Sequence, residues 1–278
     1  MSGFKNPMMW NDEEEADVIS PIVKEGSSDD PLGIGATSSR LNTQEHIDFE
    51  SLKSAEITIF LQKICAALRD GIYQYFDLEF LSEPQKQGLY NLLGEGEVEV
   101  YQKDGEELKA YETRFVGLWV VKDNQGDSLE VADFPQKIKQ YIQEHTRDEL
   151  NFSKVMPADC MNIQGIFAEI EQKYKERLQE EGNYIINFSL FPMNTKDAQF
   201  LAQNLGHIGL KIISKGYSEA IIRPTFITDI YSLQYQNNMG KIILDTIEIG
   251  HLPDAVLATR EDFRASSQRL LNIIEVYE

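Results

Sequence analysis

The sequence predicts an α+β fold built from two tandem repeats, each a mainly antiparallel sheet with helices on one face. Two observations lead to this prediction. Apolar residues change between helical spacing and two-residue alternation along the chain, and matching residues recur at a separation of 112 positions. The 278 residues, of which 42% are hydrophobic, suffice for one large domain or two small ones. We expect the repeats to span residues 54–148 and 149–278 and to pack around an approximate two-fold axis.

The segment before the repeats has a different composition. Residues 1–50 carry 11 acidic and 3 basic side chains, a net charge of 3 − 11 = −8. The stretch SSDDPLGIGATSS within it consists mostly of small and turn-forming residues. Such a composition provides little apolar surface for a packed core. We therefore expect residues 1–53 to form an acidic segment that is extended or poorly ordered.

The elements of the first repeat follow from residue spacing and turn signals. Ile57, Phe60 and Ile64 lie at helical spacing, and Gly71 is placed to end their helix. The further elements expected in this repeat are a strand at 72–81, a helix at 82–93, strands at 97–101, 111–121 and 129–131, and a helix from Pro135 to about His145.

The second repeat is recognised by residues that match the first in the same order. Six extra residues in its second hairpin change the separation from 112 to 118 positions. A helix at 165–182 takes the place of the first helix. Many matches in one order, with a single insertion, favour a duplication. The clearest matches are Leu93-Gly94 with Leu205-Gly206, Val100 with Ile212, Trp119 with Tyr231, and Glu130 with Glu248.

The stretch NLLGEGEVEV contains a Gly-x-Gly, a pattern that also occurs in phosphate-binding loops. A phosphate loop follows a strand and opens a helix, so that helix amides point at the anion. Here the expected helix precedes Gly94 and the expected strand follows it. The second repeat keeps Gly206 at the matching position but has no second glycine two residues later. Gly94 is therefore predicted to end a helix.

The bulk properties argue against several classes of protein. A net charge of −20 and a pI of about 4.6 disfavour nucleic-acid binding, because an acidic surface repels phosphates. The N-terminus lacks the regions of a signal peptide, and no apolar run is long enough for a membrane span, so we expect no membrane insertion. The only cysteines, Cys65 and Cys160, form no disulfide framework, which fits a reducing cytoplasm.

Few residues form patterns with a chemical role. The four histidines are not at ligand spacing from one another or from a cysteine, so we predict no metal site and no cofactor. Motifs of nucleophilic or phosphoryl-transfer enzymes are lacking. We therefore predict a binding protein with no catalytic residues.

Three residues have a chemical and a structural interpretation. Cys160 precedes a predicted helix, whose dipole would lower the thiol pKa and make it reactive; otherwise it is a small apolar side chain. Glu130 and Glu248 lie at matching positions within apolar strands. They are either an acid/base pair or, in each repeat, acceptors for backbone amides near the following helix.

The second hairpin of the second repeat is the candidate surface for a partner. It carries tyrosine, asparagine and methionine side chains around a longer turn, which together make an adaptable recognition surface. A slightly long hairpin with scattered aromatics is the alternative. The expected partner-binding residues are Tyr231, Tyr235, Asn237, Asn238 and Met239, together with Trp119, Glu130 and Glu248.

Several motifs together resemble one protein family. The stretches LLGEGEV, ETRFVGLWVV and LEVADFP, and then YSLQYQNNMGKIILDTIEIGHLPDAVLA, are similar to the repeated C-terminal region of the HupH/HyaF hydrogenase expression/formation proteins. The resemblance covers about residues 55–278. The chain departs from the family at Tyr231, where a tryptophan is usual. It also departs at Gln236, Gly240 and Ile163.

The resemblance implies a role in the maturation of a nickel–iron hydrogenase. Members are specialised chaperones for the small, iron–sulfur subunit, in some cases beside a thioredoxin-like co-chaperone. An acidic chain suits a basic client through long-range attraction. Two other hypotheses stay open: an iron–sulfur or metal carrier in the same pathway, and a small-molecule enzyme that uses Glu130 and Glu248.

Overall fold

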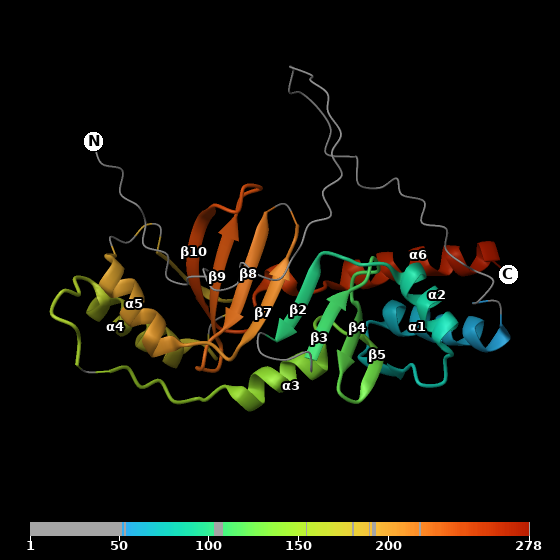
Figure 1. The fold of residues 1–278 in the computed structure, drawn as a ribbon, viewed down its shortest axis with the longest axis horizontal. Helices are drawn as coiled ribbons and strands as arrows, with labels where there is room; N and C mark the ends of the chain where they lie inside the picture. Colours follow the sequence, from blue (N-terminus) through green and yellow to red (C-terminus); the bar gives the residue numbers. More distant parts are fainter. Residues whose placement is uncertain are drawn as a thin grey trace, which may run out of the picture.

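The computed structural model describes residues 52, 54–102, 108–153, 155–179, 181–188, 190, 193–216 and 218–277 (Figure 1). Apart from Leu52, the acidic segment expected at residues 1–53 lies outside these residues. Over the described part of the chain the fold is α+β, as the sequence predicts, and it is organised around one large sheet.

The strands of both halves join in a single antiparallel sheet of ten strands, in the order β1-β5-β4-β3-β2-β7-β8-β9-β10-β6. The first half provides β1 (Gln74–Asp77), β2 (Val98–Gln102), β3 (Leu108–Glu112), β4 (Leu118–Asp123) and β5 (Gly126–Val131). The second half provides β6 (Tyr184–Asn187), β7 (Leu210–Ser214), β8 (Glu219–Pro224), β9 (Ile230–Gln236) and β10 (Ile242–Ile249).

The halves meet where β2 pairs with β7. Val100 lies opposite Ile212, and Val98 lies opposite Ser214. Val100 and Ile212 are also matched positions of the proposed repeat, so the register is the one that a two-fold axis between them would produce. The strand order also corresponds when it is read inward from either edge. The duplication itself stays a prediction.

Five helices lie on one face of this sheet. The helices α1 (Ala55–Asp70) and α2 (Glu83–Leu93) cover the first half, and α4 (Ile163–Glu176) and α5 (Thr195–Leu205) cover the second. The last helix, α6 (Arg260–Tyr277), returns from the second half and packs beside α1 (Figure 1). There the Ser267 hydroxyl donates a hydrogen bond of 2.9 Å to the Cys65 carbonyl.

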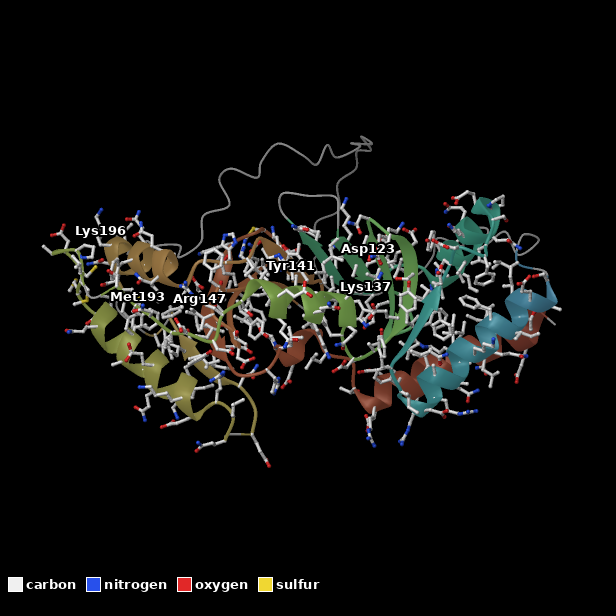
Figure 2. The ribbon with its side chains drawn as sticks, turned by 90° about the horizontal axis from the view of Figure 1, so that it is seen from below. Asp123, Lys137, Tyr141, Arg147, Met193 and Lys196 are labelled. Carbon is white, nitrogen blue, oxygen red and sulfur yellow. The ribbon has the colours of Figure 1, made fainter. Side chains whose placement is uncertain are left out.

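The helix α3 (Gln136–His145) lies on the opposite face, so the expectation that helices occupy one face is wrong. Leu118 and Val120 pack with α1 and α6, whereas Trp119 and Val121 point the other way and pack with α3. All four of these consecutive β4 residues are buried. Such a run needs cover on both faces of a sheet. Figure 2 shows α3 from below, with Lys137 and Tyr141 labelled on it.

Several element boundaries differ from the sequence prediction. The strand expected at 111–121 is split between β3 and β4 by a tight turn, where Gly117 adopts a φ of 86° and Leu118 N donates to Phe115 O at 2.9 Å. The strand expected at 72–81 is limited to β1, and the helix expected at 165–182 ends at Glu176. The predicted helix-ending glycines are confirmed: Gly71 and Gly94 follow α1 and α2.

The apolar side of α3 joins both halves, and its removal tests that role. Ile138 is fully buried in a cluster that also contains Val121 of β4 and Leu233 of β9. We expect Ile138→Ala to lower the free energy of unfolding by about 2–4 kcal/mol, because a cavity remains in the core. Urea denaturation measures this change. The control Leu178→Ala, at an 82% exposed side chain, should change it by less than about 0.5 kcal/mol.

Candidate functional site

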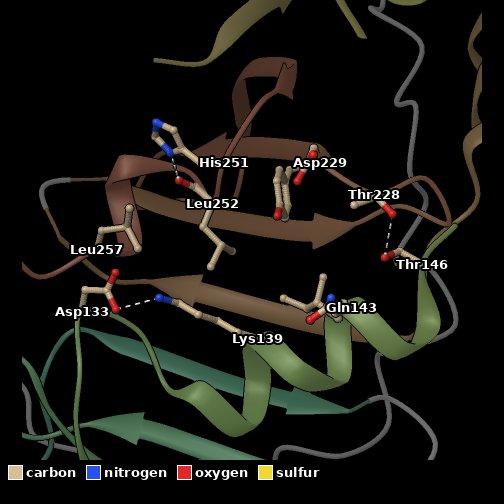
Figure 3. A pocket seen from close by; sticks show the side chains of 11 residues that line it. Asp133, Lys139, Gln143, Thr146, Thr228, Asp229, His251, Leu252 and Leu257 are labelled. Carbon is tan, nitrogen blue, oxygen red and sulfur yellow. Dashed lines mark hydrogen bonds and ion pairs between the residues drawn. The ribbon is translucent and has the colours of Figure 1, made fainter. Parts of the chain in front are cut away.

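A pocket of about 610 Å³ lies on the α3 face, between α3 and two loops of the second half (Figure 3). One loop connects β8 to β9 and the other follows β10. In Figure 3, Lys139 and Gln143 lie on the α3 side, and His251 and Leu252 lie across from them. The apolar part of the lining is formed by Ile142, Tyr231, Leu252 and Leu257.

The polar rim of the pocket is fixed by bonds within the protein. The Thr228 hydroxyl bonds the Thr146 hydroxyl at 3.1 Å, which ties the β8–β9 loop to the end of α3. The Lys139 ammonium pairs with Asp133 at 2.7 Å. The Nδ1 atom of His251 lies 2.7 Å from the carbonyl oxygen of Leu252. The lysine charge on the rim is therefore already paired.

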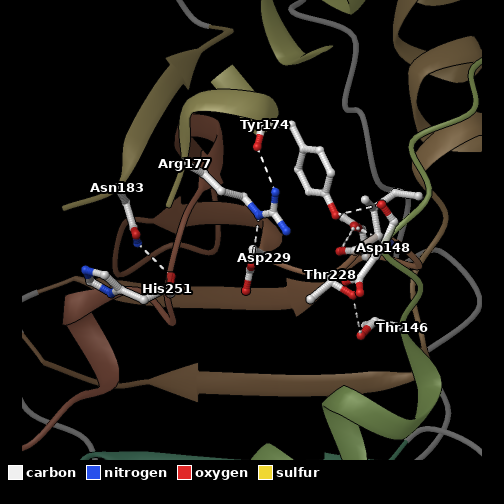
Figure 4. Close-up of polar contacts among 10 residues, drawn as sticks. Thr146, Asp148, Tyr174, Arg177, Asn183, Thr228, Asp229 and His251 are labelled. Atoms are coloured by element: carbon white, nitrogen blue, oxygen red, sulfur yellow. Dashed lines mark hydrogen bonds and ion pairs between the residues drawn. The ribbon is translucent and has the colours of Figure 1, made fainter. Parts of the chain in front are cut away.

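Asp229 has an unusual backbone conformation beside the pocket. Its φ is 59°, in the left-handed region that residues other than glycine seldom adopt. Arg177 Nε donates to its carboxylate at 2.8 Å, and Arg177 Nη1 donates to Tyr174 O at 2.8 Å (Figure 4). The Asp229 carbonyl accepts from Gly250 N at 2.9 Å. The bond from Gly250 holds the β8–β9 loop against the loop that follows β10, and the pair with Arg177 holds it against the end of α4.

Tyr231 lines the pocket with a hydroxyl that lacks an internal partner. The residue is only 4% exposed. Within the part of the chain that the structure describes, its hydroxyl forms no hydrogen bond. Burial, with a smaller effect of the Asp229 carboxylate, raises the pKa of this hydroxyl, so that it stays protonated and able to donate.

Trp119, at the matching position of the first half, has a closed environment. Its Nε1 donates to Ala132 O at 3.0 Å, and Phe134 packs edge-on against its ring. The chain after β5 continues through Phe134 into α3, which covers the indole. The chain after β10 forms only a short 3-10 helix, Asp254–Val256, before α6 leaves for the other face. The pocket occupies the place that remains beside Tyr231.

Glu130 and Glu248 act separately. Glu130 is fully buried and accepts from the backbone amides of Gln136 and Lys137, at the first turn of α3. Glu248 accepts from Asn183 Nδ2 at 3.2 Å. Burial is the main cause that raises the pKa of each carboxyl. Seven strand spacings of about 4.8 Å, roughly 34 Å in all, separate β5 from β10, which excludes a shared acid/base reaction.

Cys160 lies beside a carboxylate. Desolvation, and then the Asp197 carboxylate, raise the pKa of its thiol, which favours the interpretation as a small apolar side chain; the reactive role stays a prediction. Asp197 accepts from Met161 N and Asn162 N at the start of α4, and it thereby adds negative charge beside the sulfur. The other thiol, Cys65, is buried, and desolvation raises its pKa to about 11.

The second hairpin places its predicted residues in different environments. Tyr235 is half-buried against the α3-face core, and Asn237 shapes the turn by accepting from Met239 N and Lys241 N. Asn238 and Met239 are exposed at the tip, Met239 by 86%. The seven residues of β9, at about 3.3 Å each, separate this tip from the pocket by roughly 20 Å.

The described residues gather no group of three or more His, Cys, Asp or Glu side chains that could hold a metal ion. The iron–sulfur or metal carrier therefore stays a prediction without a site in this part of the chain. In the same part of the chain, every helix is too short or too polar to cross a membrane.

One buried carboxylate, Glu112, was not predicted from the sequence. It is 5% exposed at the end of β3, and Gly117 N donates to it at 3.2 Å. Desolvation raises its pKa to about 7. In the sequence YETRF, the neighbours of Glu112 are both apolar and polar, so they give no sign that its carboxyl is buried. The carboxyl becomes enclosed only by the turn between β3 and β4.

Glu112 predicts a pH dependence of stability. The unfolded chain loses this proton near the ordinary pKa of 4.5 and the folded chain only near 7, so stability should fall as pH rises between these values. In the unaltered protein we expect the free energy of unfolding to fall by about 2–3 kcal/mol over this pH range. In the variant Glu112→Gln, which has no group to titrate here, this fall should be absent. Denaturant titrations across this range measure it, and an unchanged profile would contradict the assignment.

The ion pair at Asp229 predicts a loss of stability when its charge is removed. Asp229→Asn keeps a residue type that tolerates the left-handed conformation but weakens the bond to Arg177. We expect the free energy of unfolding to fall by about 1–2 kcal/mol. The matched change Asp254→Asn, at a side chain 90% exposed, should cost less than about 0.5 kcal/mol. Equal effects of the two changes would contradict this role of Asp229.

Comparisons with known proteins point to one group. Residues 160–277 match the family described as HupH hydrogenase expression protein, C-terminal conserved region. The chain is 31% identical to hydrogenase expression/formation protein HupQ of Azotobacter chroococcum mcd 1 over 68% of this chain and 69% of that one. It is 30% identical to hydrogenase expression/formation protein HupH of Rhizobium leguminosarum bv. viciae, over 73% and 74%. A solved structure, hydrogenase expression protein HupH from Thiobacillus denitrificans ATCC 25259, aligns with a TM-score of 0.39 and 19% identity over 41% of this chain and 96% of that one.

Proposed function

Because the chain belongs to the HupH hydrogenase expression/formation family, we propose that it is a maturation factor that holds the small, iron–sulfur subunit of a nickel–iron hydrogenase before assembly. The observation that carries this proposal is the similarity, at about 30% identity over two thirds or more of each chain, to relatives named hydrogenase expression/formation proteins. A chaperone role, in which the protein binds its client and catalyses no reaction, agrees with the separate structural uses of Glu130 and Glu248.

We place the client on the second half of the molecule. Asn238 and Met239 present an exposed, adaptable contact at the hairpin tip. Trp119 and Glu130 are fully buried, so their part is to hold α3 and the sheet and not to touch a client. The net charge of −20 favours a client with a basic segment and increases its rate of encounter. A thioredoxin-like co-chaperone and a cytoplasmic location remain parts of this proposal.

The hairpin tip can be tested without disturbing the sheet. We expect Met239→Asp to weaken binding of the small subunit roughly tenfold, because a methionine buried at an interface contributes about 1.5–3 kcal/mol. Affinity capture from cells that express the hydrogenase operon, followed by titration with purified subunit, measures this. Val276→Asp, at a 75% exposed position near the end of α6, is the matched control and should bind as the unaltered protein does.

Two results would count against the proposal at different levels. If the small subunit is not retained by the unaltered protein, the proposed function is wrong. If it is retained equally by the Met239 variant, the function stands but the contact lies elsewhere.

A further inference from the structure

We propose that the pocket beside Tyr231 binds an extended segment of an unfolded polypeptide, which inserts one bulky apolar side chain and offers a main-chain carbonyl to the Tyr231 hydroxyl. The inference rests on the proposed function, since it gives the client-holding role a specific site. Beyond that function, the inference names the binding site and the kind of polypeptide segment that binds there.

The size and lining of the pocket fit such an anchor. Its volume of about 610 Å³ lies within the roughly 300–1,000 Å³ of ligand pockets. The interior is formed by the Tyr231 ring and by Ile142, Leu252 and Leu257. Apolar pockets typically receive the aromatic or aliphatic side chains that dominate binding energy in protein interfaces.

The charges around the pocket favour a neutral ligand. Lys139 is paired with Asp133 at 2.7 Å, and Asp229 is paired with Arg177 at 2.8 Å. These two residues therefore present no unpaired positive charge to a phosphate or carboxylate ligand, and no unpaired negative charge to an amine. A ligand gains more here from apolar burial and from hydrogen bonds to neutral groups.

The Tyr231 hydroxyl identifies one such bond. This hydroxyl has no hydrogen-bond partner among the described residues, and its residue lines the pocket, so a bound ligand can take the place of solvent there. A tyrosine hydroxyl can donate one hydrogen bond, so an acceptor on the ligand fits this position. Main-chain carbonyls are the acceptor that every peptide carries, whatever its sequence.

The rim allows a chain to enter and leave. Gln143 and His251 are exposed on opposite sides of the opening (Figure 3). The rim also joins the two halves, because α3 supplies one wall and the loops beside β9 and β10 supply the other. A segment that continues past the anchor can therefore lie across both walls.

A peptide panel tests the pocket directly. The probe is a set of overlapping labelled peptides that span the hydrogenase small subunit and an unrelated unfolded protein, titrated into the full chain by fluorescence anisotropy. We expect peptides that contain a large aromatic or aliphatic residue to bind, and to compete with one another for the same pocket. Failure of every peptide to bind overturns the inference, as does binding of a small metabolite that the peptides do not displace.

Two variants and a control locate the binding. Tyr231→Phe keeps the ring and should weaken binding about fivefold through loss of one hydrogen bond. Leu257→Asp places a charge in the apolar lining and should weaken it at least about tenfold. Tyr73→Phe makes the same change at a 51% exposed tyrosine of the first half, outside the pocket, and should have no effect.

Folding is checked separately, so that a damaged fold is not mistaken for a lost contact. Leu257 is half-buried, and Leu257→Met should retain both binding and the circular dichroism spectrum. Peptide affinity that is the same in Tyr231→Phe and Leu257→Asp as in the unaltered protein overturns the inference. Because the panel includes an unrelated protein, it gives this answer even if the small subunit proves not to be the client.

Discussion

The structure depends on the antiparallel pairing of β2 with β7. Each half alone would expose the edge of its five-stranded sheet, with unpaired amides and carbonyls along the inner strand. The pairing of Val98–Gln102 with Leu210–Ser214 satisfies both edges at once and makes one sheet of ten strands. The outer strands, β1 and β6, are the short ones, at four residues each. Short edges limit unwanted pairing with other chains.

Joining the halves also determines where the helices go. A sheet this wide buries apolar residues on both faces across its centre, as in the continuously buried start of β4. One face is covered by helices from each half and by α6, and the other depends on α3. Because the chain leaves β10 toward α6, the second half has only the short 3-10 helix Asp254–Val256 where the first half has α3. The pocket beside Tyr231 results from that difference between the halves.

The difference separates two residues that the sequence treats as equivalent. Trp119 and Tyr231 lie at matching strand positions, yet the indole has its acceptor in Ala132 and a cover in Phe134. The Tyr231 hydroxyl opens instead into a pocket whose rim comes from three separate segments. His251, Leu252 and Asp229 belong to that rim, and no local pattern marks them, because their proximity arises only when the loops after β8 and β10 meet the end of α3.

The sequence by itself determined the α+β class, the order of helices and strands, the glycines that end α1 and α2, and the family, because each depends on local spacing or on motifs within one segment. It did not determine the split at Gly117, the position of α3 or the burial of Glu112, which depend on contacts between distant segments. The tertiary structure alone decided that the halves share one sheet, that Glu130 and Glu248 lie far apart, and that an apolar pocket opens beside Tyr231. Strand pairing and the packing of α3 between halves set these distances, and neither is encoded in the spacing of residues along a single element.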